Sequence, residues 1–548
     1  MNLDHSILTI ILLTPLAGAL LLALLPDRGR IVQWSALAIT ALTFLFTLHL
    51  PFHYYAHAAA YAPLNAVPGQ QLNFYAFEQN LSWIVSPSIH YHIGVDGLSL
   101  WLVVLTGLLA PLGVLASWRS ITHRTRTFYI LFLLQQVAIL GVFIALDLFL
   151  YYGFWELSLV PMALLIATFG RTVNRRRAAI KFFLYAFVPS AILLVAMLWL
   201  YARTGTFDLP TLQAMAAAHS ISPNPAALWL ASLAFLVAFA VKVPVFPLHG
   251  WLADAVSEAP TAAVIILAGK LGLYSILRFS FGIFPEQSRR IAPLLIALGA
   301  IGIVYGALLA LVQKDLKRLA SFATLSALSF IVLGIFTFTI SGLDGGIFHI
   351  LSESLTGAAL FILFGLLYER YSTYSLNDFG GLAARLPWMV TLFVIMALSA
   401  VGLPMLNGFV GEFLVLSGSM QSNLPHHALW TALATTGVIL SAAYMLSMIQ
   451  RVFYGSVGHK IIDGITWDLT LREHLALWPL AILFLVLGIA SPFWMRVIDP
   501  AAAALADKPE HFEASPIRRV EAESYAPAAA PATNITPPFV LRNGGAHR

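Results

Sequence analysis

The chain has 548 residues, of which 59% are apolar and only 10% are charged. Soluble globular chains carry about 25% charged residues, so this composition and a mean hydropathy of +0.84 predict an all-α polytopic membrane protein. We therefore expect the chain to lie in a lipid bilayer and to bind no nucleic acid, although its net charge is +5. Because it has no cysteine, the chain cannot hold an iron–sulfur cluster, a c-type haem or a disulfide.

Fourteen apolar runs are long enough to cross a bilayer as helices. They fall at about 7–25, 31–50, 97–118, 127–146, 148–169, 179–202, 227–246, 261–283, 292–313, 318–340, 345–368, 387–418, 429–453 and 475–496. The N-terminal sequence MNLDHS lacks the basic region of a signal peptide. The first run is therefore predicted to be a retained helix.

Basic residues concentrate in the loops that follow odd-numbered helices. These residues are Arg28, Arg30, Arg119, Arg124, Arg126, Arg171, Arg175, Arg176, Arg177, Lys181, Lys314, Lys317, Arg318, Arg370, Arg385, Arg451, Lys460 and Arg472. The loops after even-numbered helices contain only Arg203, Arg278, Arg289 and Arg290. The positive-inside rule places the larger set in the cytoplasm and both termini on the outer, periplasmic side.

Two segments outside the helices are predicted to lie on the outer side. The first is a long loop at about 51–95, whose histidines are His53, His57, His90 and His92. We interpret it as a packed or solvated loop rather than a metal site, because no carboxylate constellation accompanies the histidines. The second is the stretch 500–548, rich in Ala and Pro with mixed charge, which is predicted to be a disordered tail.

The charged residues inside the predicted helices include Glu156, Lys242, Lys270, Glu353 and Glu412. A charge at the bilayer centre costs roughly 2.5–3.5 kcal/mol, so such residues indicate a functional site. Structural ion pairs would explain any one of them. An acid–base–base–acid series spread over five helices instead favours a relay of protons. His349 lies one helical turn before Glu353, on the same face, and is a further candidate relay residue.

Two helix breaks lie beside two of these charges. Val243-Pro244-Val245 follows Lys242, and Leu403-Pro404-Met405 precedes Glu412. Broken helices at membrane depth are tolerated where protein or water satisfies the freed backbone groups, and transporters use them to hold ions. The breaks are five helices apart, an odd number, so the spacing predicts two repeats of inverted topology.

Several longer motifs are specific enough to suggest a family. They are Asp96-Gly97-Leu98-Ser99, Phe154-Trp155-Glu156-Leu157-Ser158-Leu159-Val160-Pro161, Ala179-Ile180-Lys181-Phe182-Phe183-Leu184-Tyr185, Lys242-Val243-Pro244 through His249-Gly250-Trp251-Leu252, Glu258-Ala259-Pro260, Asp315-Leu316-Lys317-Arg318 and Gly408-Phe409-Val410-Gly411-Glu412-Phe413. With these motifs, about residues 90–455 resemble the antiporter-type membrane subunits of respiratory complex I, most closely the NuoM type (chain M, subunit 4). A glutamate at Glu412 and the absence of a long lateral helix match that type.

The resemblance implies about fourteen transmembrane helices with two inverted five-helix repeats, in which helices 7 and 12 are broken. The expected division of the chain is 1–96 (helices 1–2 and the outer loop), 97–126 (helix 3), 127–283 (first repeat, helices 4–8), 292–453 (second repeat, helices 9–13), 454–499 (helix 14) and 500–548 (tail).

The resemblance also implies roles for the buried charges. Glu156 would pair with Lys242, the central proton carrier of the first half; Lys270 would pass protons to the second half. Glu412 would be the terminal carrier. Glu353 stands where the family usually has a histidine, and Ser326-Ala327 replaces a Ser-His pair. We expect Glu353 to relay protons; the alternative is a counter-ion to Lys270 or another neighbour.

The sequence thus predicts a proton-translocating membrane-arm subunit of NADH–quinone oxidoreductase, driven by electron transfer in partner subunits of the respiratory chain. The resemblance implies no cofactor or metal on this chain, with flavin, iron–sulfur clusters and quinone on partners. It also implies NuoL-type and NuoN-type neighbours and a bacterial inner membrane. The nearest alternative is a subunit of a Mrp-type cation/proton antiporter or of a membrane-bound hydrogenase. A haem cytochrome is disfavoured because only His349 lies well inside a helix, and a structural anchor is the remaining alternative.

Overall fold

The structure is a computed structural model that describes residues 3–56, 75–266, 269–458 and 467–506. The chain divides into two units, Met1–Asp507 and Lys508–Arg548, and all the described residues belong to the first. His57, Lys460 and most of the predicted tail therefore lie outside the described residues.

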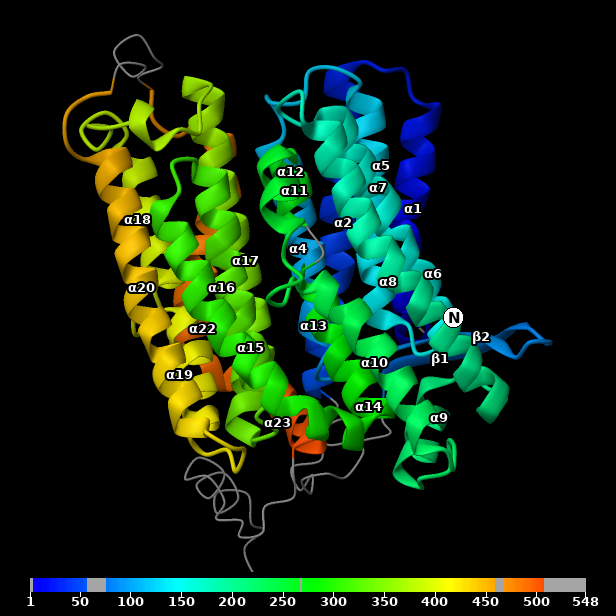
Figure 1. The fold of residues 1–548 in the computed structure, drawn as a ribbon. Coiled ribbons are helices and arrows are strands. Elements are labelled where there is room, and N and C mark those ends of the chain that lie inside the picture. The colour runs from blue at the N-terminus through cyan, green and yellow to red at the C-terminus, as the bar shows by residue number, and fades with distance from the viewer. Residues whose placement is uncertain (1–2, 57–74, 267–268, 459–466, 507–548) are drawn as a thin grey trace, which may run out of the picture. The chain divides into compact units, whose positions relative to one another are not determined.

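The described part of the chain is predominantly helical (Figure 1). The helices of the first half are α1 (Leu3–Leu24), α2 (Gly29–Ala56), α4 (Leu100–Ala116), α5 (Thr125–Ile144), α6 (Leu148–Leu157), α7 (Leu159–Phe169), α8 (Arg175–Thr204), α9 (Leu209–Ala217), α10 (Pro225–Lys242), α11 (Leu252–Glu258), α12 (Thr261–Ile265), α13 (Gly269–Ser275), the π-helix η1 (Ile276–Ser280) and α14 (Phe281–Ile283). Those of the second half are α15 (Pro285–Val312), α16 (Leu316–Ile335), α17 (Ile340–Tyr371), the 3₁₀-helix η2 (Leu376–Asp378), α18 (Pro387–Ala400), α19 (Asn407–Met420), α20 (His427–Phe453), α22 (Leu471–Ile489) and α23 (Ser491–Leu505).

Helix starts follow from local sequence chemistry. The Asp147 side chain caps α6 by accepting hydrogen bonds from the backbone N–H groups of Phe149 and Leu150. Asn224 caps α10 in the same way, and Pro225 occupies the first helical turn, where no N–H partner is needed. These caps determine the residues at which α6 and α10 begin.

The prediction of a helical polytopic membrane protein is confirmed. Among the described residues, twelve helices are long and apolar enough to cross a membrane, judged by length and composition. Two shorter apolar helices, Leu100–Ala116 and Pro387–Ala400, coincide with two further predicted runs. All fourteen predicted runs are therefore helical in whole or in part, while the number of helices that cross the membrane stays a prediction.

The predicted interruptions of two helices are present. Within the seventh predicted run, α10 ends at Lys242, and helical structure resumes only at Leu252 in α11; the twelfth run divides into α18 and α19. In the eighth run the structure shows two features that we did not predict: α12 ends at Ile265, and the π-helical turn η1 lies between α13 and α14. Backbone groups freed by such breaks must find partners inside the protein; the indole of Trp251, for example, donates to the carbonyl oxygen of Val241 at 2.9 Å.

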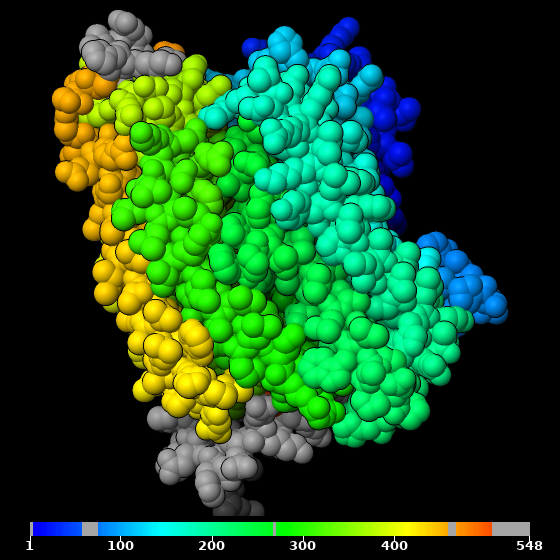
Figure 2. All heavy atoms as spheres, in the orientation of Figure 1, coloured from blue at the N-terminus to red at the C-terminus, as the bar shows by residue number. Residues whose placement is uncertain are grey.

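The divided segment from α11 to α14 connects two groups of helices. It contacts α4, α8 and α10 of the first half, and α15, α16 and α17 of the second half. On the face shown in Figure 2, the green atoms of the middle of the chain lie between the cyan atoms of an earlier part and the yellow atoms of a later part. Residues of the two halves therefore meet around this segment.

The predicted outer loop at 51–95 contains regular structure. Its first residues, 51–56, continue α2, and β1 (Ala76–Ile84) pairs antiparallel with β2 (Ile89–Val95). The backbone N–H of Leu146, just after α5, donates to the carbonyl oxygen of His92, and the N–H of Leu209, the first residue of α9, donates to the carbonyl oxygen of Leu146. The hairpin is therefore bonded to the end of α5, which in turn is bonded to the start of α9. We did not predict this hairpin, because the alternation of two short strands is a weak signal in a segment rich in His and Tyr.

Two sequence interpretations of this loop and of the tail need correction. His92 is buried between the carboxylates of Asp208, 2.6 Å from Nδ1, and Glu78, 2.8 Å from Nε2. We had expected no carboxylates around the loop histidines. That expectation was wrong because Asp208 is 116 positions from His92 in the sequence and only the fold brings the two together. The predicted tail also begins too early, because residues 500–505 belong to α23.

Three basic residues that we assigned to loops are buried. Arg278 lies in η1, Lys317 near the start of α16 and Arg370 near the end of α17, each at most 7% exposed. Arg370 pairs with the buried Glu473 at 2.6 Å. The partners of these side chains come from other parts of the fold. A count of basic residues per loop cannot detect such burial.

Candidate functional site

Lys242 is the last residue of α10 and only 3% exposed. The helix ends there because Pro244 has no N–H and its ring clashes with the preceding turn. The Lys242 ammonium donates to the Ser158 hydroxyl at 3.1 Å and lies 4.8 Å above the centre of the Trp155 ring. A hydroxyl and an aromatic face thus replace part of its hydration shell.

Glu156 directly follows Trp155 in the sequence and lies two residues before Ser158. One of its carboxylate oxygens accepts a hydrogen bond from the Ser190 hydroxyl of α8, which in turn accepts from the Trp155 indole at 3.1 Å. Glu156 acts electrostatically on Lys242, although among the described residues no direct ion pair joins the two. Among the described residues, Glu156 and Lys242 therefore interact electrostatically at a distance and form no closed salt bridge.

Lys270 lies in α13, next to the end of α10. A Cβ atom on Gly272 would lie 2.9 Å from the backbone nitrogen of Val243, so α13 packs tightly against the residue that follows Lys242. The hydroxyls of Tyr151 and Ser275 meet at 2.6 Å in the same region. Lys242 and Lys270 therefore lie on helices that pack against each other.

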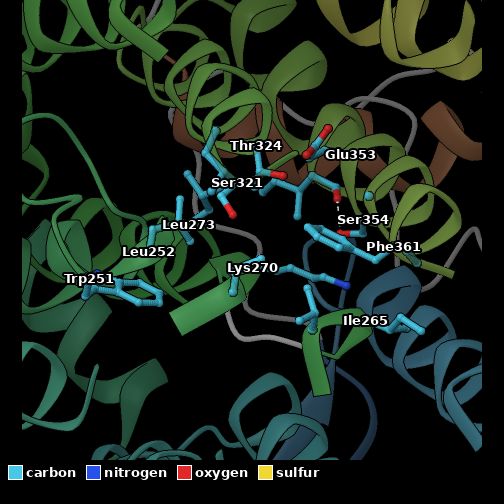
Figure 3. Close-up of a pocket in the computed structure, with 16 residues that line it drawn as sticks. Trp251, Leu252, Ile265, Lys270, Leu273, Ser321, Thr324, Glu353, Ser354 and Phe361 are labelled. Carbon is cyan, nitrogen blue, oxygen red and sulfur yellow. Dashed lines mark hydrogen bonds between the residues drawn. The ribbon is translucent and has the colours of Figure 1, made fainter. Parts of the chain in front are cut away.

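A cavity of about 70 Å³ separates Lys270 from Glu353 of α17. Figure 3 shows Lys270 on one side of this cavity and Ser321, Thr324 and Glu353 on the opposite side. One water needs about 10–15 Å³ of such volume, so the cavity has room for several. Lys270 and Glu353 interact electrostatically across it, and among the described residues no ion pair closes the gap.

Glu412 of α19 lies on the far side of Glu353. The two carboxylates act on each other electrostatically, and both act on the buried Tyr444 of α20. The Glu412 side chain folds over the break between α18 and α19: a Cβ on Gly402 would lie 2.3 Å from its Oε2. Gly402 also has φ of +75°, a conformation that favours glycine. The second break therefore depends on glycine at the point where the glutamate covers it.

Polar groups satisfy this second break. Asn407 donates from its side-chain amide to the Ser352 hydroxyl at 2.9 Å and accepts from the Ser399 hydroxyl at 2.5 Å. These bonds join α17, α18 and α19. His349, on α17, is 3% exposed, and neither ring nitrogen has a hydrogen-bond partner among the described residues.

Two buried charges near the site were missed in the sequence analysis. Arg278 makes a two-pronged ion pair with Asp96, with distances of 2.6 and 2.5 Å. Burial opposes ionisation of Asp96, but the guanidinium and the hydrogen bonds outweigh it and hold the pKa of that carboxyl below its usual value. Lys317 donates to the carbonyl oxygen of Ala259 at 2.6 Å. Arg278 could have been recognised from the sequence because, like Lys242, it is a lone charge inside an apolar run.

The fold and the site together define a class: multi-span helical membrane proteins that hold ionisable side chains between their helices. Residues 145–441 match the family model described as "NADH:quinone oxidoreductase/Mrp antiporter, TM". Residues 37–146 match "NADH-ubiquinone oxidoreductase chain 4, amino terminus".

Relatives over nearly the whole chain agree with these matches. NADH-quinone oxidoreductase subunit M of Rhodobacter capsulatus is 38% identical over 517 residues, 91% of this chain and 96% of that one. Subunit M of Escherichia coli K12 is 35% identical, covering 88% of this chain and 93% of that one. The chain belongs to the family of NADH:quinone oxidoreductase membrane subunits designated M or chain 4.

Two solved structures share the fold. A chain of respiratory complex I from Thermus thermophilus superposes with a TM-score of 0.79 at 31% identity, covering 91% of this chain and 98% of that one. A chain of the Mrp complex from Dietzia superposes with the same TM-score at 22% identity, covering 92% of this chain and 98% of that one. The second likeness concerns the fold alone.

Proposed function

We propose that this chain is the proton-translocating membrane-arm subunit of an NADH–quinone oxidoreductase and works as part of that enzyme. Electron transfer in partner subunits supplies the energy, and flavin, iron–sulfur clusters and quinone reside on those partners. The family membership and the complex I fold match support this assignment. Its neighbours in the membrane arm are subunits of the NuoL and NuoN type.

The observation that carries the proposal is the arrangement of Lys270 and Glu353 around one small cavity. An ammonium and a carboxylate that interact without contact can exchange protons through intervening water, because burial disfavours both charges while each charge favours the other. A closed ion pair would instead hold both groups charged. Lys242 and Glu412 extend the series on either side, each beside a helix break.

The roles follow the order of the series. Glu156 sets the proton affinity of Lys242 through their electrostatic interaction, and Lys242 passes its proton toward Lys270. Glu353 receives it across the cavity, and Glu412 is the terminal carrier. His349 is a further relay candidate between the last two. The two inverted repeats would span 127–283 and 292–453, with a helix break beside Lys242 in the first and beside Glu412 in the second, and both termini would lie on the outer side of a bacterial inner membrane.

The decisive experiment measures proton pumping and NADH oxidation in membrane vesicles that contain the assembled complex. Lys242→Ala should abolish pumping while the complex still assembles, because it removes the ammonium group that carries the proton beside the first helix break. Lys314→Ala, which removes an exposed lysine outside the site, is the matched control. Wild-type pumping in Lys242→Ala would support a structural anchor instead.

Glu353 is tested separately with two substitutions. Glu353→Gln keeps the shape and removes the titratable carboxyl group, whereas Glu353→His restores a titratable group. A relay predicts loss of pumping in the first and recovery in the second. Full pumping in Glu353→Gln would leave Glu353 without a relay role. Purifying the native assembly and measuring NADH dehydrogenase activity distinguishes this function from an antiporter or hydrogenase subunit.

A further inference from the structure

Three side chains that the proposed function does not use meet where the start of α1 lies beside the end of α2. Oδ1 of Asp4 is 2.8 Å from Nε2 of His49 and 3.3 Å from Nδ1 of His53. One ligand atom from each residue lies within 4.8 Å of the others. Two imidazoles and one carboxylate therefore converge on a single point.

Local sequence and helix pairing produce this meeting. His49 and His53 are four residues apart on α2 and so share one helix face. The connection between α1 and α2 is short, so the two helices run antiparallel and contact each other. Asp4 in the first turn of α1 is thereby brought to the last turns of α2.

The spacing suits a divalent transition metal. Zn²⁺ binds histidine nitrogen at about 2.0–2.1 Å and carboxylate oxygen at about 2.0–2.2 Å in tetrahedral geometry, which places neighbouring ligand atoms about 3.3 Å apart. The separations of the Asp4 oxygen from the His49 and His53 nitrogens, 2.8 and 3.3 Å, are close to that value, and the two nitrogens lie within 4.8 Å of each other. Imidazole favours Zn²⁺, Cu²⁺ and Ni²⁺, whereas Mg²⁺ and Ca²⁺ prefer oxygen-only sites.

The three side chains are partly open to solvent, and an aromatic ring covers one side of them. The side chains of Asp4, His49 and His53 are 37%, 33% and 18% exposed. The Phe77 ring of β1 lies 6.1 Å from the His49 ring and 5.0 Å from the His53 ring, and so shields one side. The chain has no cysteine to compete for the metal.

We propose that Asp4, His49 and His53 bind one Zn²⁺ ion, with water in the fourth position. The ion joins α1 to α2 beneath the hairpin strand β1. This site is independent of the proton series, so its failure leaves the proposed function untouched. The alternative is a carboxylate that only accepts hydrogen bonds from two imidazoles.

The test uses the full-length chain in detergent, with a histidine-free affinity tag at its C-terminus, stripped with a chelator. Zinc is then titrated by calorimetry, and bound metal is counted by mass spectrometry. Wild type should retain one equivalent of zinc in the presence of excess Mg²⁺. His49→Ala and His53→Ala should each weaken binding at least about tenfold, the lower end of the loss seen even for outer-shell partners of metal ligands.

Two further variants keep the test decisive. Asp4→Asn still accepts a hydrogen bond but loses the anionic ligand, and it should also weaken zinc binding. His90→Ala removes a histidine of β2 that contacts Asn80 and Ser88, and it should bind zinc like wild type. Gel filtration and circular dichroism establish that each variant is folded. Equal zinc content in wild type and His49→Ala, or no zinc in wild type, would overturn the site.

Discussion

The imidazole of His349 on α17 packs directly against Gly411 on α19, one residue before Glu412. A Cβ atom on Gly411 would lie 2.7 Å from Nδ1 and 2.8 Å from Cβ of His349. Glycine at this position therefore lets the histidine approach the helix that carries the last glutamate of the series. This contact links the two residues without a hydrogen bond.

Gly411→Ala should displace His349 and lower proton pumping several-fold. The added methyl group overpacks the contact, which typically costs about 1–3 kcal/mol. Pumping is measured against NADH oxidation in vesicles with the assembled complex. Gly153→Ala is the control, because no atom lies within 4 Å of the Cβ it would add. Equal pumping in the two variants would exclude a role for the position of His349.

Ser190→Ala should slow pumping by roughly twofold to tenfold. The hydroxyl bridges the Trp155 indole and the Glu156 carboxylate, and a hydrogen bond contributes about 0.5–1.5 kcal/mol, where 1.36 kcal/mol corresponds to a tenfold change in rate. Ser190→Thr keeps the hydroxyl and should restore most of the rate. Indistinguishable rates in Ala and Thr variants would show that the bridge does not affect proton transfer.

Breaking the pair between Asp96 and Arg278 should destabilise the folded chain by about 3–5 kcal/mol, because removal of one partner leaves the other charge buried and unpaired. Thermal unfolding of Asp96→Asn and Arg278→Met in the assembled complex measures this loss. The double variant Asp96→Leu/Arg278→Met should recover much of it, since no buried charge remains. Additive losses in the double variant would contradict a coupled pair.

The cluster around His92 should make stability depend on pH. Burial opposes the charged ring, but the hydrogen bonds and charges of Asp208 and Glu78 outweigh it and raise the pKa of His92. A raised pKa contributes stability that is fully present below the unfolded value, about 6.5, and is lost as pH rises through the folded pKa.

The same cluster holds the pKa of Asp208 below its usual value: burial alone would raise it, and the His92 and Thr211 hydrogen bonds outweigh that effect. Its contribution is present above the unfolded value, about 3.9, and is lost as pH falls through the folded pKa. The stability difference between wild type and His92→Gln should therefore be largest in mildly acidic solution and shrink toward alkaline pH. His90→Gln is the control; a difference that does not change with pH would contradict the assignment.

The sequence by itself determined the membrane class, the helical runs and the two breaks. These features depend on interactions within one segment: hydropathy over about twenty residues, and the missing N–H of Pro244 beside Lys242. The motifs around Glu156, Lys242 and Glu412 were also sufficient to predict the family.

Only the tertiary structure decided which of these side chains meet. The Lys270–Glu353 cavity, the Asp96–Arg278 pair and the convergence of Asp4 with His49 join residues that are 45 or more positions apart. Periodicity within a helix gives the face on which a residue lies but not the partner that packs against that face. The partner depends on how the helices pack, and that packing leaves no local pattern in the sequence.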